Sequence, residues 1–259
     1  MQESDLALLI RAAQTAAETA TRYIGGEMNV RHKAADGSPV TDADMAVNSV
    51  LGDILRGARP DYGWLSEESA DDGARLAARR VFIVDPIDGT RSFIEGSESW
   101  AHSLAVAEDG EITAAVVYLP MRDRLYDAAL GEGARLNGEA LRTSRVATLE
   151  EAHVLATRPA LDPAHWHEAP DLQRSHRPSI AYRLGLVAEG RFDAMFTFRP
   201  SWEWDIAAGA LLLSEAGARI TDRHGAPLRF NAATPLHQGI VAANPALHDD
   251  ILRRLRPLP

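Results

Sequence analysis

The chain has 259 residues, a formal net charge of −10 and no cysteine. Its composition, 46% hydrophobic and 25% charged, is typical of a globular protein with no disordered tract. The negative charge disfavours a nucleic acid polymer as partner, and the lack of cysteine excludes disulfides, thiolate metal ligands and thiol nucleophiles. A small anionic substrate stays possible, because bound divalent cations can invert the field of an acidic cleft.

Targeting and membrane signals are missing from the sequence. The first ten residues carry Glu3 and Asp5 and lack the basic start and apolar run of a secretory signal. No stretch approaches the ~18 consecutive apolar residues of a membrane span. We therefore expect a cytoplasmic protein without integral membrane association.

Two amphipathic helices are predicted before residue 60, separated by a polar stretch at residues 33–39. The first follows Ser4 and stops at Gly25 and Gly26, and the second is capped by Thr41 or Asp42. Each has one apolar face, expected to pack on a core. The apolar positions are Leu6, Leu9, Ile10, Ala13 and Ala17 in the first helix and Val47, Val50, Leu51, Ile54 and Leu55 in the second.

Short strands are predicted from residue 62 onward. They lie at residues 64–65, 81–84, 103–107 and 112–118, with hairpin turns at residues 109–110 and 137–138. Because two helices are followed by strands joined through short turns, we expect an antiparallel sheet with helices packed on it rather than a doubly wound parallel sheet.

Beyond about residue 145 the pattern alternates between strands and helices. Strands are predicted at residues 153–156, 192–198 and 218–221, with helices at 205–216 and 251–255. The fold class is therefore mixed α+β, with a second α/β layer in the C-terminal half. We expect two domains, residues 1–144 and residues 145–259.

Two carboxylates are predicted to emerge where a buried strand ends. The apolar run at residues 81–84 leads directly into Asp85 and Asp88. Pro86 fixes φ, so that the turn can direct both carboxylates to one point and leave the Ile87 carbonyl free. Such oxygen donors suit Mg²⁺. A plain strand terminator is the alternative interpretation.

Two other segments could add carboxylates to this site. Glu67 and Glu68 follow a short strand, and Asp205 stands at or beside a helix N-terminus behind Trp202 and Trp204. Taken alone, the glutamates are more often solvated and the aspartate is more often a helix cap. The two tryptophans are interpreted as packing supports, with lining of a substrate cleft as the alternative.

Three motifs in this order make the chain similar to the inositol monophosphatase superfamily of Mg²⁺-dependent, lithium-sensitive phosphatases. They are Glu67-Glu68, Asp-Pro-Ile-Asp-Gly-Thr at residues 85–90 and Trp-Asp-Ile-Ala-Ala-Gly at residues 204–209. The resemblance spans nearly the whole chain. It implies a layered αβαβα sandwich, hydrolysis of a small phosphorylated metabolite with two or three Mg²⁺ per site, and a possible homodimer.

The resemblance also assigns metal ligands to matching residues. Glu67, Asp85 and the Ile87 carbonyl would hold the first Mg²⁺, while Asp85, Asp88 and Asp205 would hold the second. In this arrangement one metal acidifies a water and the other stabilises the leaving oxygen. The N-terminal domain would thus supply most ligands, and the C-terminal domain would contribute Asp205 and substrate contacts.

The remaining implied roles concern water and phosphate. Glu67 and Thr90 would orient the attacking water, and the amides of Gly89 and Thr90 would bind the phosphate. Asp44 would contact a third, weakly held ion through water and assist Thr90. Alternatively, Asp44 or Asp42 simply favours the start of the second helix.

Within the superfamily, residues 88–94 and 203–205 look most similar to bacterial 3'(2'),5'-bisphosphate nucleotidases, which convert adenosine 3',5'-bisphosphate to AMP during sulfate assimilation. Those enzymes usually carry Gly-Ser-Ser followed by Lys, whereas residues 178–183 here read Pro-Ser-Ile-Ala-Tyr-Arg. Inositol-1-monophosphatase and histidinol-phosphate phosphatase are the alternatives. A non-catalytic binder of metal or phosphometabolites is a further alternative.

The residues before Asp205 bear on this choice. The inositol enzymes usually place an acid there, whereas residues 196–199 form an apolar, basic stretch that suits a nucleotide better than a polyol. Arg183 and Arg199 are candidate contacts for a second anionic group, with solvated surface as the alternative. The histidines show no paired metal-ligand spacing and are interpreted as surface or satisfied core residues.

Overall fold

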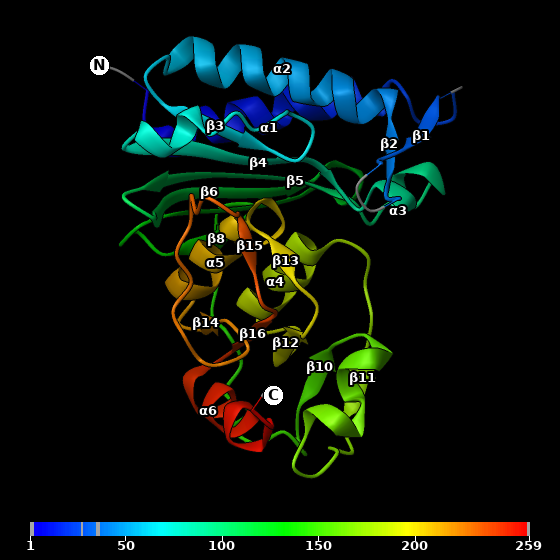
Figure 1. Cartoon of the computed structure of the whole chain (residues 1–259), viewed down its shortest axis with the longest axis vertical. Helices are drawn as coiled ribbons and strands as arrows, with labels where there is room; N and C mark the ends of the chain where they lie inside the picture. The colour runs from blue at the N-terminus through cyan, green and yellow to red at the C-terminus, as the bar shows by residue number, and fades with distance from the viewer. Residues whose placement is uncertain (1–2, 27, 35–36, 258–259) are drawn as a thin grey trace.

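A computed structural model describes residues 3–26, 28–34 and 37–257. Helices and sheets alternate in five layers, helix–sheet–helix–sheet–helix, stacked along the long axis (Figure 1). The mixed α+β class and the layered sandwich predicted from the sequence are thereby confirmed. Within the described residues, no helix combines the length and apolarity that crossing a membrane requires.

The first layer consists of α1 (Asp5–Thr21) and α2 (Asp42–Ala58), the two predicted helices. Ser4 caps α1 through a hydrogen bond from the Ala7 amide, and Thr41 caps α2 in a capping box with Asp44. The chain between them forms a ribbon of β1 (Val30–His32) and β2 (Pro39–Thr41), where the sequence suggested only a polar stretch. Residues 35 and 36 of that stretch lie outside the described residues.

The second layer is a sheet of seven strands arranged in chain order. They are β3 (Gly63–Ser66), β4 (Arg80–Asp88), β5 (Ala101–Glu108), β6 (Glu111–Leu119), β7 (Arg124–Ala129), β8 (Ala134–Leu136) and β9 (Glu139–Ala140). The predicted turns at residues 109–110 and 137–138 are confirmed, with positive φ at all four residues. The expectation of a purely antiparallel sheet is wrong at one edge, because the crossover through η1 (Ala74–Ala77) makes β3 parallel to β4.

Strand β4 lies between two cores, which explains its continuous apolar run. Phe82 and Val84 face α1 and α2, whereas Val81 and Ile83 face the helices of the third layer. A strand covered on both faces has no position that prefers a polar residue. The central strand therefore carries the carboxylates that follow it into the middle of the molecule.

The third layer is a pair of helices, α4 (Ile180–Ala188) and α5 (Glu203–Glu215), packed between the two sheets. The sequence analysis missed α4 because nearly all of its residues are buried, which leaves no amphipathic period. Helix α5 begins two residues earlier than predicted. Its N-terminus is tied down by a ribbon of β13 (Ser201–Trp202) and β15 (Leu236–His237).

The remaining layers are a second sheet and the closing helix. The sheet has the order β11 (Gln173–Ser175), β10 (His153–Leu155), β12 (Ala194–Thr197), β16 (Ile240–Ala243) and β14 (Arg219–Thr221). Beneath it lie α6 (Pro245–Arg254), longer than predicted because Asn244 caps it, and the short turns η3 (Arg158–Leu161) and η4 (Pro163–His165). Helix α3 (Thr90–Ile94) follows β4, and η2 (Pro120–Arg122) follows β6. The division at residues 144 and 145 stays a prediction.

Close packing of α4 on α5 depends on Gly209. A Cβ atom at this position would lie 2.6 Å from the Cβ of Leu184, an atom that cannot swing aside. We expect Gly209→Ala to lower the free energy of unfolding by about 1–3 kcal/mol through overpacking. The measurement is urea unfolding followed by fluorescence.

The matched control is Gly52→Ala in α2, where the nearest atom to the added Cβ is a ring carbon of Trp64 at 4.0 Å. This variant should be neutral or more stable by up to about 1 kcal/mol, because alanine restricts the unfolded chain and favours the helix. Equal effects of the two variants would contradict the packing role of Gly209.

Candidate active site

Three carboxylates converge where the first sheet meets α5. Glu67, Asp85 and Asp205 each place a carboxylate oxygen within 4.8 Å of the other two. The first two are neighbours because β3 and β4 run parallel, and the Glu67 amide donates to the Val84 carbonyl at 3.1 Å. The third arrives from the first turn of α5. Three segments distant in sequence thus build one acidic cluster.

Strand β4 does not end at residue 84 but continues to Asp88 through a bulge. Asp85 pairs with Ser103 and Asp88 with Ala101, so the β4 side has one extra residue. The bulge follows from Pro86, which has no amide hydrogen for the ladder. It replaces the turn expected from the sequence and separates the two carboxylates.

The bulge has its own hydrogen bonds. The Ile87 amide donates to Asp85 Oδ1 at 3.0 Å. The Ile87 carbonyl, predicted to be free, accepts a hydrogen bond from Thr90 Oγ1 at 3.3 Å. One carbonyl lone pair is therefore still open to a further ligand.

Asp88 turns toward α4 and is not part of the three-carboxylate cluster. Its Oδ2 accepts from Ser179 Oγ at 2.6 Å and from the Ala181 amide at 2.7 Å. Ser179 also caps α4 by accepting from the Tyr182 amide. The sequence analysis missed Ser179, although a serine after Pro178 is a recognisable helix-start signal. Only Oδ1 of Asp88 remains free to face the cluster.

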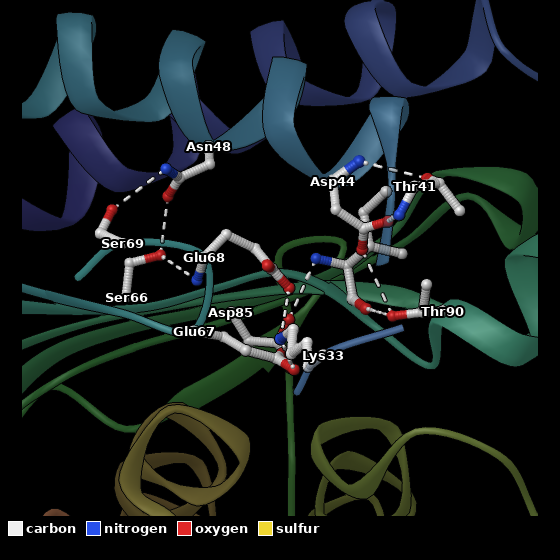
Figure 2. Close-up of polar contacts among 11 residues, drawn as sticks. Lys33, Thr41, Asp44, Asn48, Ser66, Glu67, Glu68, Ser69, Asp85 and Thr90 are labelled. Carbon is white, nitrogen blue, oxygen red and sulfur yellow. Dashed lines mark hydrogen bonds and ion pairs between the residues drawn. The ribbon is translucent and has the colours of Figure 1, made fainter. Parts of the chain in front are cut away.

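Figure 2 shows a second polar group above the sheet, formed by Thr41, Asp44 and Thr90. Asp44 Oδ2 accepts from the amide and hydroxyl of Thr41 at 2.8 and 2.6 Å, and Asp44 Oδ1 accepts from Thr90 Oγ1 at 3.3 Å. Asp44 therefore serves the helix start and also contacts Thr90. Its burial raises its pKa, although the hydrogen bonds from Thr41 oppose the rise.

Lys33 is a member of the site that the sequence did not reveal. It extends from the end of β1, and its Nζ lies 2.7 Å from Glu67 Oε1 and 2.8 Å from Glu68 Oε1 (Figure 2). Burial lowers the pKa of Lys33, but the two glutamates outweigh that effect and raise it. The ammonium group therefore supplies one positive charge to the acidic cluster.

One ammonium does not neutralise this cluster. Burial and the neighbouring carboxylates raise the pKa of Asp85 and Asp205 well above the usual range. Burial also raises the pKa of Asp88, although the hydrogen bond from Ser179 opposes the rise. Burial raises the pKa of Glu68 to about 7. Crowded carboxylate oxygens with no nitrogen or sulfur donor among them are the ligand set of a hard divalent cation, so the residues fit Mg²⁺.

Gly89 connects the bulge to α3 in a conformation that other residues rarely adopt. Its φ is 100°, and a Cβ would lie 3.3 Å from the Ser99 carbonyl. A glycine here was predicted to allow close approach of a ligand. The conformation explains the glycine, while phosphate binding by the Gly89 and Thr90 amides stays a prediction.

The predicted substrate contacts differ in their surroundings. The buried Arg183 donates from Nε to the Ser179 carbonyl at 3.2 Å and lies close enough to Asp88 and Asp205 to interact electrostatically. Arg199 is exposed. The stretch at residues 196–199 does not present both of its phenylalanines to a substrate, because Phe196 is buried in the core beneath the second sheet and Phe198 packs half-buried against it.

Two histidines depart from the expectation of surface or satisfied core residues. His102 Nδ1 contacts the Pro86 carbonyl at 2.5 Å, and its Nε2 is buried without a partner among the described residues. The Nε2 of His237 is likewise buried and unpaired in the described part of the chain. Burial lowers the pKa of His102 to about 4, so this ring stays neutral at pH 7.

Comparisons with known proteins agree with this geometry. The model of the inositol monophosphatase family matches residues 1–258. Inositol-1-monophosphatase of Rhizobium meliloti is 32% identical, over 98% of this chain and 97% of the relative. Histidinol-phosphatase of Mycobacterium tuberculosis is 34% identical, over 98% of this chain and 99% of the relative. The 2'AMP-bound inositol monophosphatase II of Staphylococcus aureus superimposes with a TM-score of 0.78 at 25% identity. The superposition covers 95% of this chain and 91% of the Staphylococcus chain.

The raised carboxyl pKa values make stability depend on pH and on metal. A carboxyl whose pKa is raised keeps its proton in the folded protein at pH values where the unfolded chain has lost it. The free energy of unfolding of the metal-free protein therefore falls as the pH rises through the pKa values of these groups. For Glu68 the decrease continues up to its folded-state pKa of about 7. We expect Mg²⁺ to raise the unfolding temperature more at about pH 8 than at about pH 5, because it binds deprotonated ligands.

Thermal unfolding with EDTA or saturating Mg²⁺ across this pH range measures the effect. Glu68→Gln should weaken the pH dependence of the metal-free protein, whereas Glu139→Gln, at an exposed position on β9, should leave it unchanged. A stabilisation by Mg²⁺ that is the same at both pH values would contradict the coupling.

Proposed function

The chain belongs to the inositol monophosphatase family and is a phosphatase, and we propose that it is a Mg²⁺-dependent 3'(2'),5'-bisphosphate nucleotidase. In this proposal it hydrolyses adenosine 3',5'-bisphosphate to AMP and phosphate. The convergence of Glu67, Asp85 and Asp205 supports the metal dependence. The buried Arg183, which interacts electrostatically with Asp88 and Asp205, supports a substrate with a second anionic group.

We assign the ligands as follows. Glu67, Asp85 and the Ile87 carbonyl would hold the first Mg²⁺, and Asp85, the free Oδ1 of Asp88 and Asp205 the second. The single ammonium of Lys33 among the raised-pKa carboxyls supports a requirement for more positive charge. Bound Mg²⁺ would supply an acidified water and charge stabilisation at the leaving oxygen.

The chain's own groups then position the water and the phosphate. The one hydrogen of Thr90 Oγ1 is directed at Asp44 Oδ1 or at the Ile87 carbonyl, each 3.3 Å away, and either arrangement leaves the hydroxyl oxygen free to accept a hydrogen bond from the attacking water. Glu67 would accept the other water hydrogen and so fix its direction of attack. The amides of Gly89 and Thr90 would hold the phosphate oxygens. A third ion near Asp44 remains part of the proposal.

The preference for a bisphosphate rests on arginines that form no ion pair. Arg174, Arg177 and Arg183 donate to backbone carbonyls, and none of them forms an ion pair with an acidic side chain in the described ranges. Arg199 also has no such pair within those ranges. All four act electrostatically on the exposed His176, so they form one positively charged patch, and Arg183 connects this patch to Asp88 and Asp205. Arginines that form no ion pair in a chain of net charge −10 suit a substrate anion.

Two other substrates are alternatives, each favoured by a relative. The Rhizobium protein is named inositol-1-monophosphatase and the Mycobacterium protein histidinol-phosphatase, at similar identity. The Staphylococcus protein has been solved both with 2'AMP and with inositol monophosphate bound, so it is compatible with a nucleotide and with a polyol. Because none of these names is a bisphosphate nucleotidase, the substrate must be decided by experiment.

Loss of a metal ligand should abolish turnover without unfolding the protein. We expect Asp88→Asn and Asp205→Asn to lower Mg²⁺-dependent phosphate release by at least about 100-fold. Asparagine at position 88 can still accept from Ser179 and the Ala181 amide, so circular dichroism should be unchanged. The matched control is Asp53→Asn on the exposed face of α2. Near-normal turnover in either ligand variant would remove that residue from the mechanism.

The substrate prediction concerns Arg199. We expect kcat/KM to be highest for adenosine 3',5'-bisphosphate in a panel that includes 2'-AMP, inositol 1-phosphate and histidinol phosphate. Arg199→Gln should lower the ratio of bisphosphate to 2'-AMP turnover by roughly 10-fold, because only the former has a second phosphate.

Arg22→Gln, at an exposed arginine that follows α1, is the matched control and should leave that ratio unchanged. A clear preference for inositol 1-phosphate or histidinol phosphate would keep the metal mechanism and refute the nucleotidase assignment.

A further inference from the structure

An exposed aromatic surface lies next to the metal-ligand cluster. Trp202 is 38% exposed and is the one aromatic residue among the exposed large hydrophobic side chains of the described chain. It is the N-cap residue of α5, three positions before Asp205. The Trp202 backbone forms a hydrogen bond with the Asp205 carboxylate, which places residue 202 beside the acidic cluster.

The indole of Trp202 is held flat by a second indole. Its ring stacks on that of Trp204 with a centroid distance of 4.8 Å and an interplanar angle of 11°. Trp204 in turn packs on the core between the sheet and α4 and α5. No third aromatic ring contacts this pair within the described residues, so the Trp202 ring is covered by an aromatic partner on one face only.

The backbone that carries the stack is fixed at several points. Trp202 pairs with Leu236 in the β13–β15 ribbon, and the Trp204 carbonyl accepts from Ser103 Oγ of the first sheet at 3.0 Å. The buried Glu203 between them accepts from the amides of Asn231 and Ala232 at 2.6 and 2.9 Å. Burial raises the pKa of Asp205, and a hydrogen bond from the Trp202 backbone opposes this rise. The stack and the ligand are thus one rigid unit.

A preorganised indole with an open face is a surface on which planar rings stack, and stacking is tolerant of the identity of the base. Phe196 is buried and Phe198 is half-buried in the core beneath the second sheet, whereas the Trp202 ring is exposed. A polyol has no flat face to place against it. We infer that Trp202 binds the nucleobase of the substrate by stacking and so determines specificity for planar heteroaromatic phosphate esters.

This inference rests on the proposed function and names the group that recognises the base. The test compares Trp202→Leu with Trp202→Phe, using adenosine 3',5'-bisphosphate and glycerol 2-phosphate as the aromatic and non-aromatic substrates. We expect Trp202→Leu to raise KM for the nucleotide about 10-fold relative to its effect on KM for glycerol 2-phosphate, at similar kcat. Trp202→Phe should recover most of the loss, because it keeps a ring.

A binding measurement separates this inference from the proposed function. Titration with AMP should quench the tryptophan fluorescence of the wild type and should quench that of Trp202→Leu much less. If nucleotides are hydrolysed but Trp202→Leu changes neither the KM ratio nor the quenching, the stacking role is overturned and the nucleotidase stands. If no nucleotide is hydrolysed yet AMP quenches through Trp202, the nucleotidase fails and the base-binding surface stands.

Discussion

Mutual repulsion among buried carboxylates is the constraint on which the rest of this structure depends. The buried Asp85 and the half-buried Glu67 and Asp205 come together, with the buried Asp88 beside them, and burial and the neighbouring carboxylates raise the pKa values of the three aspartates. Such an arrangement costs folding free energy unless cations or hydrogen bonds offset it. Lys33 offsets part of it at Glu67, and Ser179 with the Ala181 amide offsets part at Asp88. The remaining negative charge is what a divalent metal would neutralise.

The layered fold is what allows a protein to hold these groups together. Strand β4 is packed on both faces, so its carboxyl end is rigid, and the bulge at Pro86 directs Asp85 and Asp88 to different partners. Helix α5 lies between the two sheets and brings Asp205 from more than a hundred residues away. Gly209 permits the close contact of α5 with α4 that sets this position. Packing throughout the third layer therefore acts on the metal site.

The sequence was informative where the chemistry is local. Asp85 and Asp88 could be placed because an apolar strand runs straight into them, and Thr41 because a helix cap has a clear signature. Helix α4 could not be found, since burial on all sides erases its period. Lys33 gave no signal, because its partners are 34 and 35 residues away. Phe196 was assigned to the wrong surface, because residue type does not tell which face of a strand meets the substrate.

Catalysis and specificity occupy different parts of the site, for an electrostatic reason. The carboxylates tolerate little change, since each is held by backbone, hydroxyl or ammonium donors and any loss leaves a buried charge unpaired. Arg174, Arg177 and Arg199 form no ion pair with a carboxylate in the described chain, and the Trp202 ring is held by stacking on Trp204. Substitutions of these residues can change the preferred substrate from a polyol phosphate to a phosphate ester that carries an imidazole or a nucleobase, while the metal ligands stay in place. Relatives at similar identity can therefore bear the names of different phosphatases on one metal-binding framework.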